Sequence, residues 1–152
     1  MATFKPQDPN FEARVRTSFA RQKMMHAIGA KLMSVSPGAV EIELPFRDDL
    51  TQQHGFLHAG IIATIGDSAC GYAALSLAPA DSAVLSIEYK INLVSPAAGE
   101  RFIARGCVTK PGRTVSVCAG DVFALSEGND RKLVATMLST MMLLADRAGL
   151  AD

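Results

Sequence analysis

The chain has 152 residues, and its 15 basic and 15 acidic side chains give a formal net charge of zero. A chain of this length can form one domain with a sizeable core. The balanced charge, without a long run of one sign, excludes the usual electrostatic basis for binding nucleic acid or an anionic membrane. We therefore expect a single domain over residues 1–152, with its core over about 10–144, that binds neither.

The three cysteines, Cys70, Cys107 and Cys118, are an odd number and lack the spacing of a metal site. Each stands among apolar residues, which is typical of buried, reduced thiols. The N-terminal residues contain no apolar segment of the signal-peptide type. Together these features indicate a cytoplasmic protein without a metal site.

The first part of the chain predicts a helix followed by a hairpin. Asp8 and Pro9 have the order of an N-cap and a first helical residue, and Gly29 is a typical helix stop. These signals predict one amphipathic helix over about 9–28. A Ser-Pro-Gly turn then separates two short strands, the first of which is expected over 30–36.

Residues 57–80 are almost entirely small or apolar, and Asp67 is the only charged residue among them. A segment this apolar is normally buried on all sides, which predicts a central helix over about 59–77, ended by Pro79. Its glycines and Asp67 make it a poor membrane span. Because burial of an ionised carboxylate is costly unless it is compensated, Asp67 is either a structural defect or a functional group.

Four strands are predicted after this helix. Apolar and polar residues alternate strictly over 85–93, and further strands are expected over 101–110, 113–126 and 132–144. Hairpin-linked strands with segregated helices are typical of an α+β fold with an antiparallel sheet. Because the helix at 59–77 is too apolar for the surface, we expect the sheet to wrap around it, with the apolar face of 85–93 covering the helix.

The start of the central helix carries unpaired backbone N–H groups at Ala59, Gly60 and their neighbours. This positive end of the helix dipole can hold an oxyanion, and Gly60 allows close approach of a ligand. Asp67 lies eight residues further along, roughly 12 Å along the helix axis. One carboxylate therefore cannot easily serve a carbonyl bound at its own helix start. Antiparallel packing of two copies would bring Asp67 of one to Ala59 of the other, which predicts a composite site in a dimer.

A larger motif surrounds these positions and consists of Gln52, His58-Ala59-Gly60, Asp67, a strand that ends before Ser95-Pro96, and a Gly112-Arg113 turn. Its spacing and the strand order resemble the hotdog-fold acyl-CoA thioesterases of the phenylacetyl-CoA thioesterase type, over nearly the whole chain. The resemblance implies hydrolysis of acyl-CoA thioesters to free acid and coenzyme A by a homodimer or a dimer of dimers. It implies no cofactor other than the coenzyme A of the substrate.

The resemblance also implies catalytic roles for the matched residues. Asp67 is similar to the general base, or alternatively the nucleophile, and the backbone N–H of Ala59 is similar to the oxyanion donor. Gln52 matches a loop amide that orients water or the thioester, and Gln53 is the alternative if the register differs by one residue. His58 matches the histidine that shapes the donor turn.

Gly60, Ser86 and Arg113 are expected to contact the substrate. Ser86 matches a strand serine near the reaction centre, and Arg113 matches a basic turn residue that meets the nucleotide end of coenzyme A. The family more often has His-Gly-Gly where this chain has Ala59, but alanine keeps the backbone N–H. Alternation places Ser86 on the face away from the helix, unless a bulge or a position at the dimer edge changes this.

Two other functions fit the same resemblance. The first is a hotdog enoyl-CoA hydratase, although His58 does not present the motif associated with that reaction. The second is a non-catalytic acyl-CoA-binding protein. Burial is expected to raise the pKa of Asp67, which would suit a general base near neutral pH.

Overall fold

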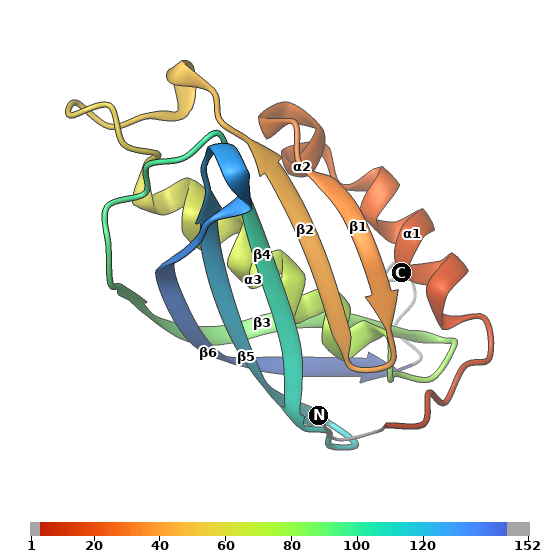
Figure 1. The fold of residues 1–152 in the computed structure, drawn as a ribbon. Coiled ribbons are helices and arrows are strands. Elements are labelled where there is room, and N and C mark those ends of the chain that lie inside the picture. The colour runs from red at the N-terminus through yellow and green to blue at the C-terminus, as the bar shows by residue number, and fades with distance from the viewer. Residues whose placement is uncertain (1–3, 146–152) are drawn as a thin grey trace.

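The computed structural model describes residues 4–145. The helices and strands are α1 (Phe11–Arg21), α2 (Lys23–Ile28), β1 (Lys31–Ser36), β2 (Ala39–Pro45), α3 (Ala59–Leu75), β3 (Ser82–Leu93), β4 (Arg101–Lys110), β5 (Val115–Leu125) and β6 (Arg131–Ala145), with two short 3₁₀ helices, Asp48–Leu50 and Glu127–Asn129. The six strands form one antiparallel sheet in the order β1-β2-β4-β5-β6-β3. The sheet curls around α3, so the predicted α+β architecture is confirmed (Figure 1). Among the helices of residues 4–145, none has the length and apolar character needed to cross a bilayer.

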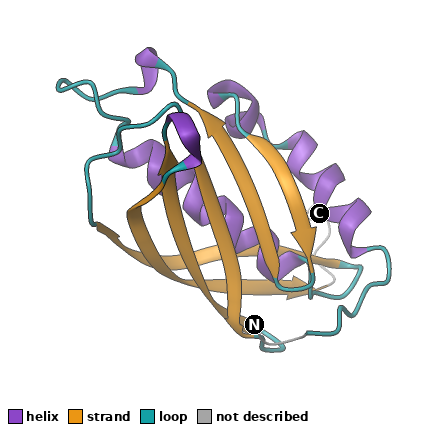
Figure 2. Cartoon of the chain, viewed as in Figure 1, coloured by secondary structure: helices purple, strands orange, loops and turns teal. Residues whose placement is uncertain are grey.

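Close contact between α3 and the middle of the sheet depends on small residues on both sides. A Cβ at Gly106 of β4 would lie 2.2 Å from the carbonyl carbon of Ala69, and one at Gly120 of β5 would lie 2.8 Å from Sγ of Cys70. Real side chains do not approach this closely, so both glycines are needed for the sheet to reach the helix. The strands therefore wrap closely along the length of α3 (Figure 2).

The helix predicted over 9–28 is two helices, because the backbone of Gln22 is extended (φ −77°, ψ 98°). Gln22 ends α1, and its carbonyl accepts the N–H of Met25 at the start of α2. The predicted stop is confirmed, since Gly29 adopts the left-handed conformation after α2 (φ 78°). The predicted cap at Asp8 is wrong. The N-cap is Asn10, whose backbone N–H donates to the Asp8 carboxylate (2.8 Å).

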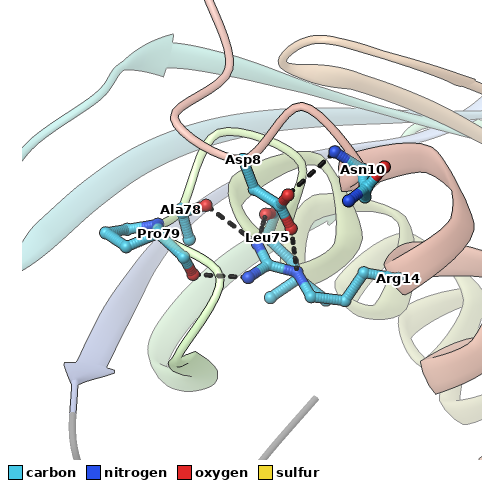
Figure 3. A network of polar contacts seen from close by, with 6 residues as sticks. All are labelled: Asp8, Asn10, Arg14, Leu75, Ala78 and Pro79. Atoms are coloured by element: carbon cyan, nitrogen blue, oxygen red, sulfur yellow. Dashed lines mark hydrogen bonds and ion pairs between the residues drawn. The ribbon is translucent and has the colours of Figure 1, made fainter.

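Asp8 instead helps Arg14 to hold the far end of α3 (Figure 3). The Arg14 guanidinium donates to the carbonyl oxygens of Leu75 and Ala78, each at 2.8 Å, and to that of Pro79. Its Nε lies 3.6 Å from the Asp8 carboxylate, and the two side chains are only 9% and 7% exposed. These carbonyls lie at the end of α3 and just after it, where a cation is favourable, so Arg14 ties α1 to the end of α3.

The prediction that the apolar face over 85–93 covers α3 is confirmed only at Ile91, which packs against the core. Leu85, Ile87, Tyr89 and Leu93 are between 45% and 55% exposed. β3 is an edge strand that pairs with β6, and the core is already covered by strands in the middle of the sheet. The pairing with β6 also shifts register between Ser86 and Glu88, which makes Ile87 the extra residue of a bulge.

Candidate active site

The first turn of α3 leaves one backbone donor available. His58 is the N-cap, and its Nδ1 accepts the N–H of Gly60 at 2.9 Å. The N–H groups of Ile61 and Ile62 both donate to the carbonyl of His58. Among the residues that the structure describes, none accepts a hydrogen bond from the N–H of Ala59. His58 thus pairs with the other three N–H groups and leaves the N–H of Ala59, the predicted oxyanion donor, unpaired.

A cavity of about 390 Å³, here called the donor pocket, lies against this turn. Gln52 and Ala59 line one side of it, and Leu93 and Val94 at the end of β3 line another. The Gln52 side-chain oxygen accepts the backbone N–H of His54. Its Nε2 has no partner within residues 4–145, so the Gln52 amide can still donate a hydrogen bond at the donor pocket.

Asp67 is half-buried further along α3, and its carboxylate pairs with Ser86 of β3. The Ser86 hydroxyl donates a 2.7 Å hydrogen bond to Oδ1. Burial raises the pKa of Asp67 above the ordinary carboxyl value, while the hydrogen bond from Ser86 lowers it, and burial is the larger effect. The carboxylate is therefore more basic than an exposed one, as general-base chemistry requires.

A second cavity of about 120 Å³, here called the acid pocket, lies in front of Asp67. Ser86 and Val84 contribute its β3 wall, and Gln22, at the break between α1 and α2, lies across it. The acid pocket and the donor pocket share no lining residue. One chain therefore holds the carboxylate and the unpaired N–H in separate pockets, as the spacing of Ala59 and Asp67 predicts.

The structure brings together only some of the predicted site residues. Gln52 joins Ala59 at the donor pocket, and Ser86 reaches Asp67 because of the bulge. Gly60 is held by the His58 cap. Arg113 is exposed on the turn between β4 and β5 and lines neither pocket. Reasoning from the sequence does not identify Gln22, because nothing in the helical pattern distinguishes it from a solvated surface glutamine.

Neither buried thiol competes with Asp67 as a nucleophile. Burial raises the pKa of Cys70 to about 12, and burial also raises the pKa of Cys118. A thiol is nucleophilic only as the thiolate, so both stay unreactive near neutral pH. Within residues 4–145, no three His, Cys, Asp or Glu side chains are grouped so that they could hold a metal ion.

The chain is similar to thioesterases and esterases in sequence. Residues 54–129, half of the chain, match the model of the thioesterase superfamily. Human acyl-coenzyme A thioesterase 13 is 31% identical over 105 residues, which are 68% of this chain and 72% of that protein. A putative esterase of Saccharolobus solfataricus is 33% identical over 90 residues, and one of Halobacterium salinarum is 31% identical over 99. These matches cover 59% and 62% of this chain, and they span just under two thirds of the two archaeal relatives, 64% and 65%.

Known structures agree with this assignment. A thioesterase family protein from Silicibacter pomeroyi superposes with a TM-score of 0.87 and 48% identity, covering 89% of this chain and 98% of that one. The PaaI protein of the E. coli phenylacetic acid degradation operon superposes with a TM-score of 0.79 over 95% of this chain and 98% of that one. Its 18% identity supports the shared hotdog fold alone. The chain belongs to the thioesterase superfamily.

Proposed function

We propose that the protein hydrolyses acyl-CoA thioesters to a free carboxylic acid and coenzyme A. The observation that carries the proposal is the pair of groups on α3. The N–H of Ala59 has no acceptor among the described residues, and Asp67 is a carboxylate of raised pKa held by Ser86. These are the two groups that addition of water to a thioester needs: a donor for the oxyanion and a base for the water.

The two groups come from different subunits of a homodimer in this proposal. β3 is an edge strand with exposed apolar side chains, and it lines both pockets, the acid pocket with Ser86 and the donor pocket with Leu93. Antiparallel pairing of β3 with β3 of a second copy, about a two-fold axis near Tyr89, would set Ser86 opposite Leu93 of the partner subunit. The acid pocket of each subunit would then face the partner's donor pocket. A dimer of such dimers stays a prediction.

The proposed reaction begins with the thioester carbonyl hydrogen-bonded to the N–H of Ala59. Asp67 of the partner subunit takes a proton from water, and the water oxygen forms a bond to the carbonyl carbon. The electron pair of the carbonyl moves to its oxygen, which Ala59 stabilises. When the carbonyl re-forms, the C–S bond breaks and the thiolate of coenzyme A leaves. The proton that Asp67 took from water completes the thiol and regenerates the carboxylate. Gln52 orients the water or the thioester.

Other roles stay predictions within this proposal. His58 acts through the N-cap that shapes the donor turn, and Gly60 gives the thioester room to approach. Arg113 is an exposed cation that would meet the phosphates of coenzyme A. No cofactor is needed besides the coenzyme A of the substrate. The cytoplasmic location also stays a prediction.

Complementation between two inactive variants tests the function and the shared site together. Asp67→Asn removes the base, and we expect kcat to fall by about 10²–10⁴. Ala59→Pro removes only the N–H, because proline is favoured at the first position of a helix and the extended backbone of His58 (φ −62°, ψ 138°) suits the residue before proline. Ala59→Ser, which keeps the N–H, is the matched control.

Co-expression of the two variants should restore about a quarter of wild-type activity, because about half of the dimers are mixed and each has one intact site. No recovery in verified mixed dimers would place the whole site within one chain and contradict the proposal. Full activity of Asp67→Asn would refute thioester hydrolysis through this carboxylate. Tight acyl-CoA binding without turnover would instead favour the binding protein, and hydration of crotonyl-CoA would favour the hydratase.

A further inference from the structure

The acid pocket ends inside the protein. Tyr72 and Leu75, which are 8% and 1% exposed, line it from the α3 side, and Gln22 lies across it from the break between α1 and α2. At about 120 Å³ the pocket is somewhat smaller than the roughly 150 Å³ cavity that holds one benzene molecule in an engineered protein. It therefore has space for about six heavy atoms or fewer.

A pocket of this size fits only one end of an acyl-CoA. The coenzyme A arm is long and must reach solvent, where its charged nucleotide is hydrated, so it cannot end against Tyr72 and Leu75. The acyl group is the part of the substrate that can terminate against these buried side chains. Since Asp67 must lie beside the thioester carbon, the atoms that extend from it into the acid pocket are those of the acyl group.

The lining of the acid pocket is polar for an acyl site. Besides Asp67 and Ser86 it includes Ser68 and Gln22, and the Ser68 hydroxyl lies 3.4 Å from Oε1 of Gln22, as a donor to it. This contact orients the amide and leaves Nε2 of Gln22 without a partner among the described residues. Gln22 is half-buried at the wall of the pocket, so this N–H donor is available to an oxygen atom of a bound ligand.

The position of Gln22 is fixed by the backbone on both sides. Its N–H donates to the carbonyl of Phe19 and its carbonyl accepts the N–H of Met25, so the side chain projects from a defined break rather than from a regular helix. Phe19 in turn packs against Tyr72, with ring centroids 5.7 Å apart. The wall that Gln22 forms is therefore anchored to α3.

We propose that the acid pocket selects a short acyl group that carries a hydroxyl or carbonyl oxygen, and that Gln22 is the residue that determines this specificity. The inference rests on the proposed function, because it needs Asp67 to act on the thioester carbon. Gln22 limits acyl length by closing the pocket, and its Nε2 donates a hydrogen bond to the acyl oxygen. It contacts the acyl group and not the reacting atoms.

The test compares kcat/KM for butyryl-, 3-hydroxybutyryl-, hexanoyl- and decanoyl-CoA, with release of free thiol as the readout. The wild type should prefer 3-hydroxybutyryl- over butyryl-CoA by about fivefold to tenfold, the worth of one hydrogen bond. It should hydrolyse decanoyl-CoA at least about 100-fold less efficiently than butyryl-CoA, because the longer chain does not fit.

Two variants separate the two roles of Gln22. Gln22→Leu keeps the size of the side chain and removes the donor, so the hydroxyl preference should disappear while the length limit stays. Gln22→Ala opens the wall and should raise the efficiency with decanoyl-CoA relative to butyryl-CoA. Gln7→Leu, at an exposed position outside the pocket, is the matched control and should change neither ratio.

Equal efficiency of the wild type with butyryl- and decanoyl-CoA would overturn the inference, whether or not the variants fold. So would an unchanged hydroxyl preference in Gln22→Leu. Both results leave thioester hydrolysis itself intact. If the wild type hydrolyses none of the four substrates, this inference fails. If Asp67→Asn retains full activity, the proposed function fails and this inference fails with it.

Discussion

The Ser86 hydroxyl donates a 2.7 Å hydrogen bond to Oδ1 of Asp67, although strict alternation along β3 would turn Ser86 away from α3. The bulge at Ile87 removes the conflict by shifting the register between Ser86 and Glu88. Bulges commonly re-aim a side chain in this way. The edge strand thereby supplies a polar partner to the one carboxylate on α3.

Ser86→Ala should move the rising part of the pH profile of kcat/KM to higher pH. The carboxylate of Asp67 is the active form, and Ser86 stabilises that form, so loss of the hydroxyl raises the pKa of Asp67 further. Activity measured across the acidic range checks the shift. Ser86→Thr keeps a hydroxyl and serves as the control, and a profile of Ser86→Ala that moves to lower pH would contradict this prediction.

Asp67→Asn should raise thermal stability at neutral pH even though it abolishes activity. The pKa of Asp67 is raised in the folded chain by burial, so folding favours the protonated form. The stabilisation that Asp67 gives the folded chain is complete below the ordinary carboxyl pKa. It is lost as the pH rises through the pKa that Asp67 has in the folded chain. Asparagine stays neutral and avoids that loss. Thermal unfolding at acidic and neutral pH tests this.

Asp49 is a control for that experiment, because its pKa is shifted in the opposite direction to that of Asp67. It is exposed, and its hydrogen bond with Arg47 lowers the pKa of the Asp49 carboxyl. Asp49→Asn should therefore give no stabilisation at neutral pH. If Asp67→Asn unfolds at a lower temperature than the wild type at neutral pH, burial of the charge is not the dominant effect at Asp67.

His58→Ala should lower the free energy of unfolding by about 1 kcal/mol, because Gly60 loses its N-cap acceptor. Activity should fall as well, since the cap shapes the turn that carries the N–H of Ala59. His58→Asn supplies another good N-cap and should restore both properties. Chemical denaturation and kcat for the three proteins test this. A stable but inactive His58→Asn would show that the imidazole itself takes part in the reaction.

Arg14→Ala should be among the most destabilising changes outside the central core. It removes three hydrogen bonds at the end of α3 and leaves the buried Asp8 carboxylate without its cation, which should cost about 3 kcal/mol. Arg16→Ala is the matched control, because its pair with Glu12 is exposed and contributes less than about 0.5 kcal/mol. Similar free energies of unfolding for both variants would contradict the prediction.

Much of the fold could be predicted because periodicity identifies elements well. The strand expected over 101–110 has the bounds of β4, and the apolar helix begins at Ala59 as predicted. The alternation of apolar and polar residues does not indicate what covers an apolar face. Residues 85–93 alternate as a buried strand would, yet this face is exposed in the single chain. In the proposed dimer, a second copy covers it, and no intrachain pattern distinguishes the two cases.

The site could be predicted in part for a similar reason. Ala59 and Asp67 lie on one regular helix, so their separation follows from helix geometry. The contact of Ser86 depends on a one-residue bulge, and the place of Gln22 depends on a break within a continuous helical pattern. Tertiary packing determines the bulge and the break, and the spacing of residues along the chain does not indicate either of them.

The break at Gln22 lies outside residues 54–129, the part of the chain that matches the superfamily model, whereas Ala59 and Asp67 lie inside it. If Gln22 selects the acyl group, this protein encodes the chemistry and the choice of substrate in separate stretches of sequence. Substitutions in α1 and α2 could then change which thioester is accepted without disturbing the residues that cleave it. Homologues with the same catalytic motif but a different residue at the break would be expected to differ in substrate.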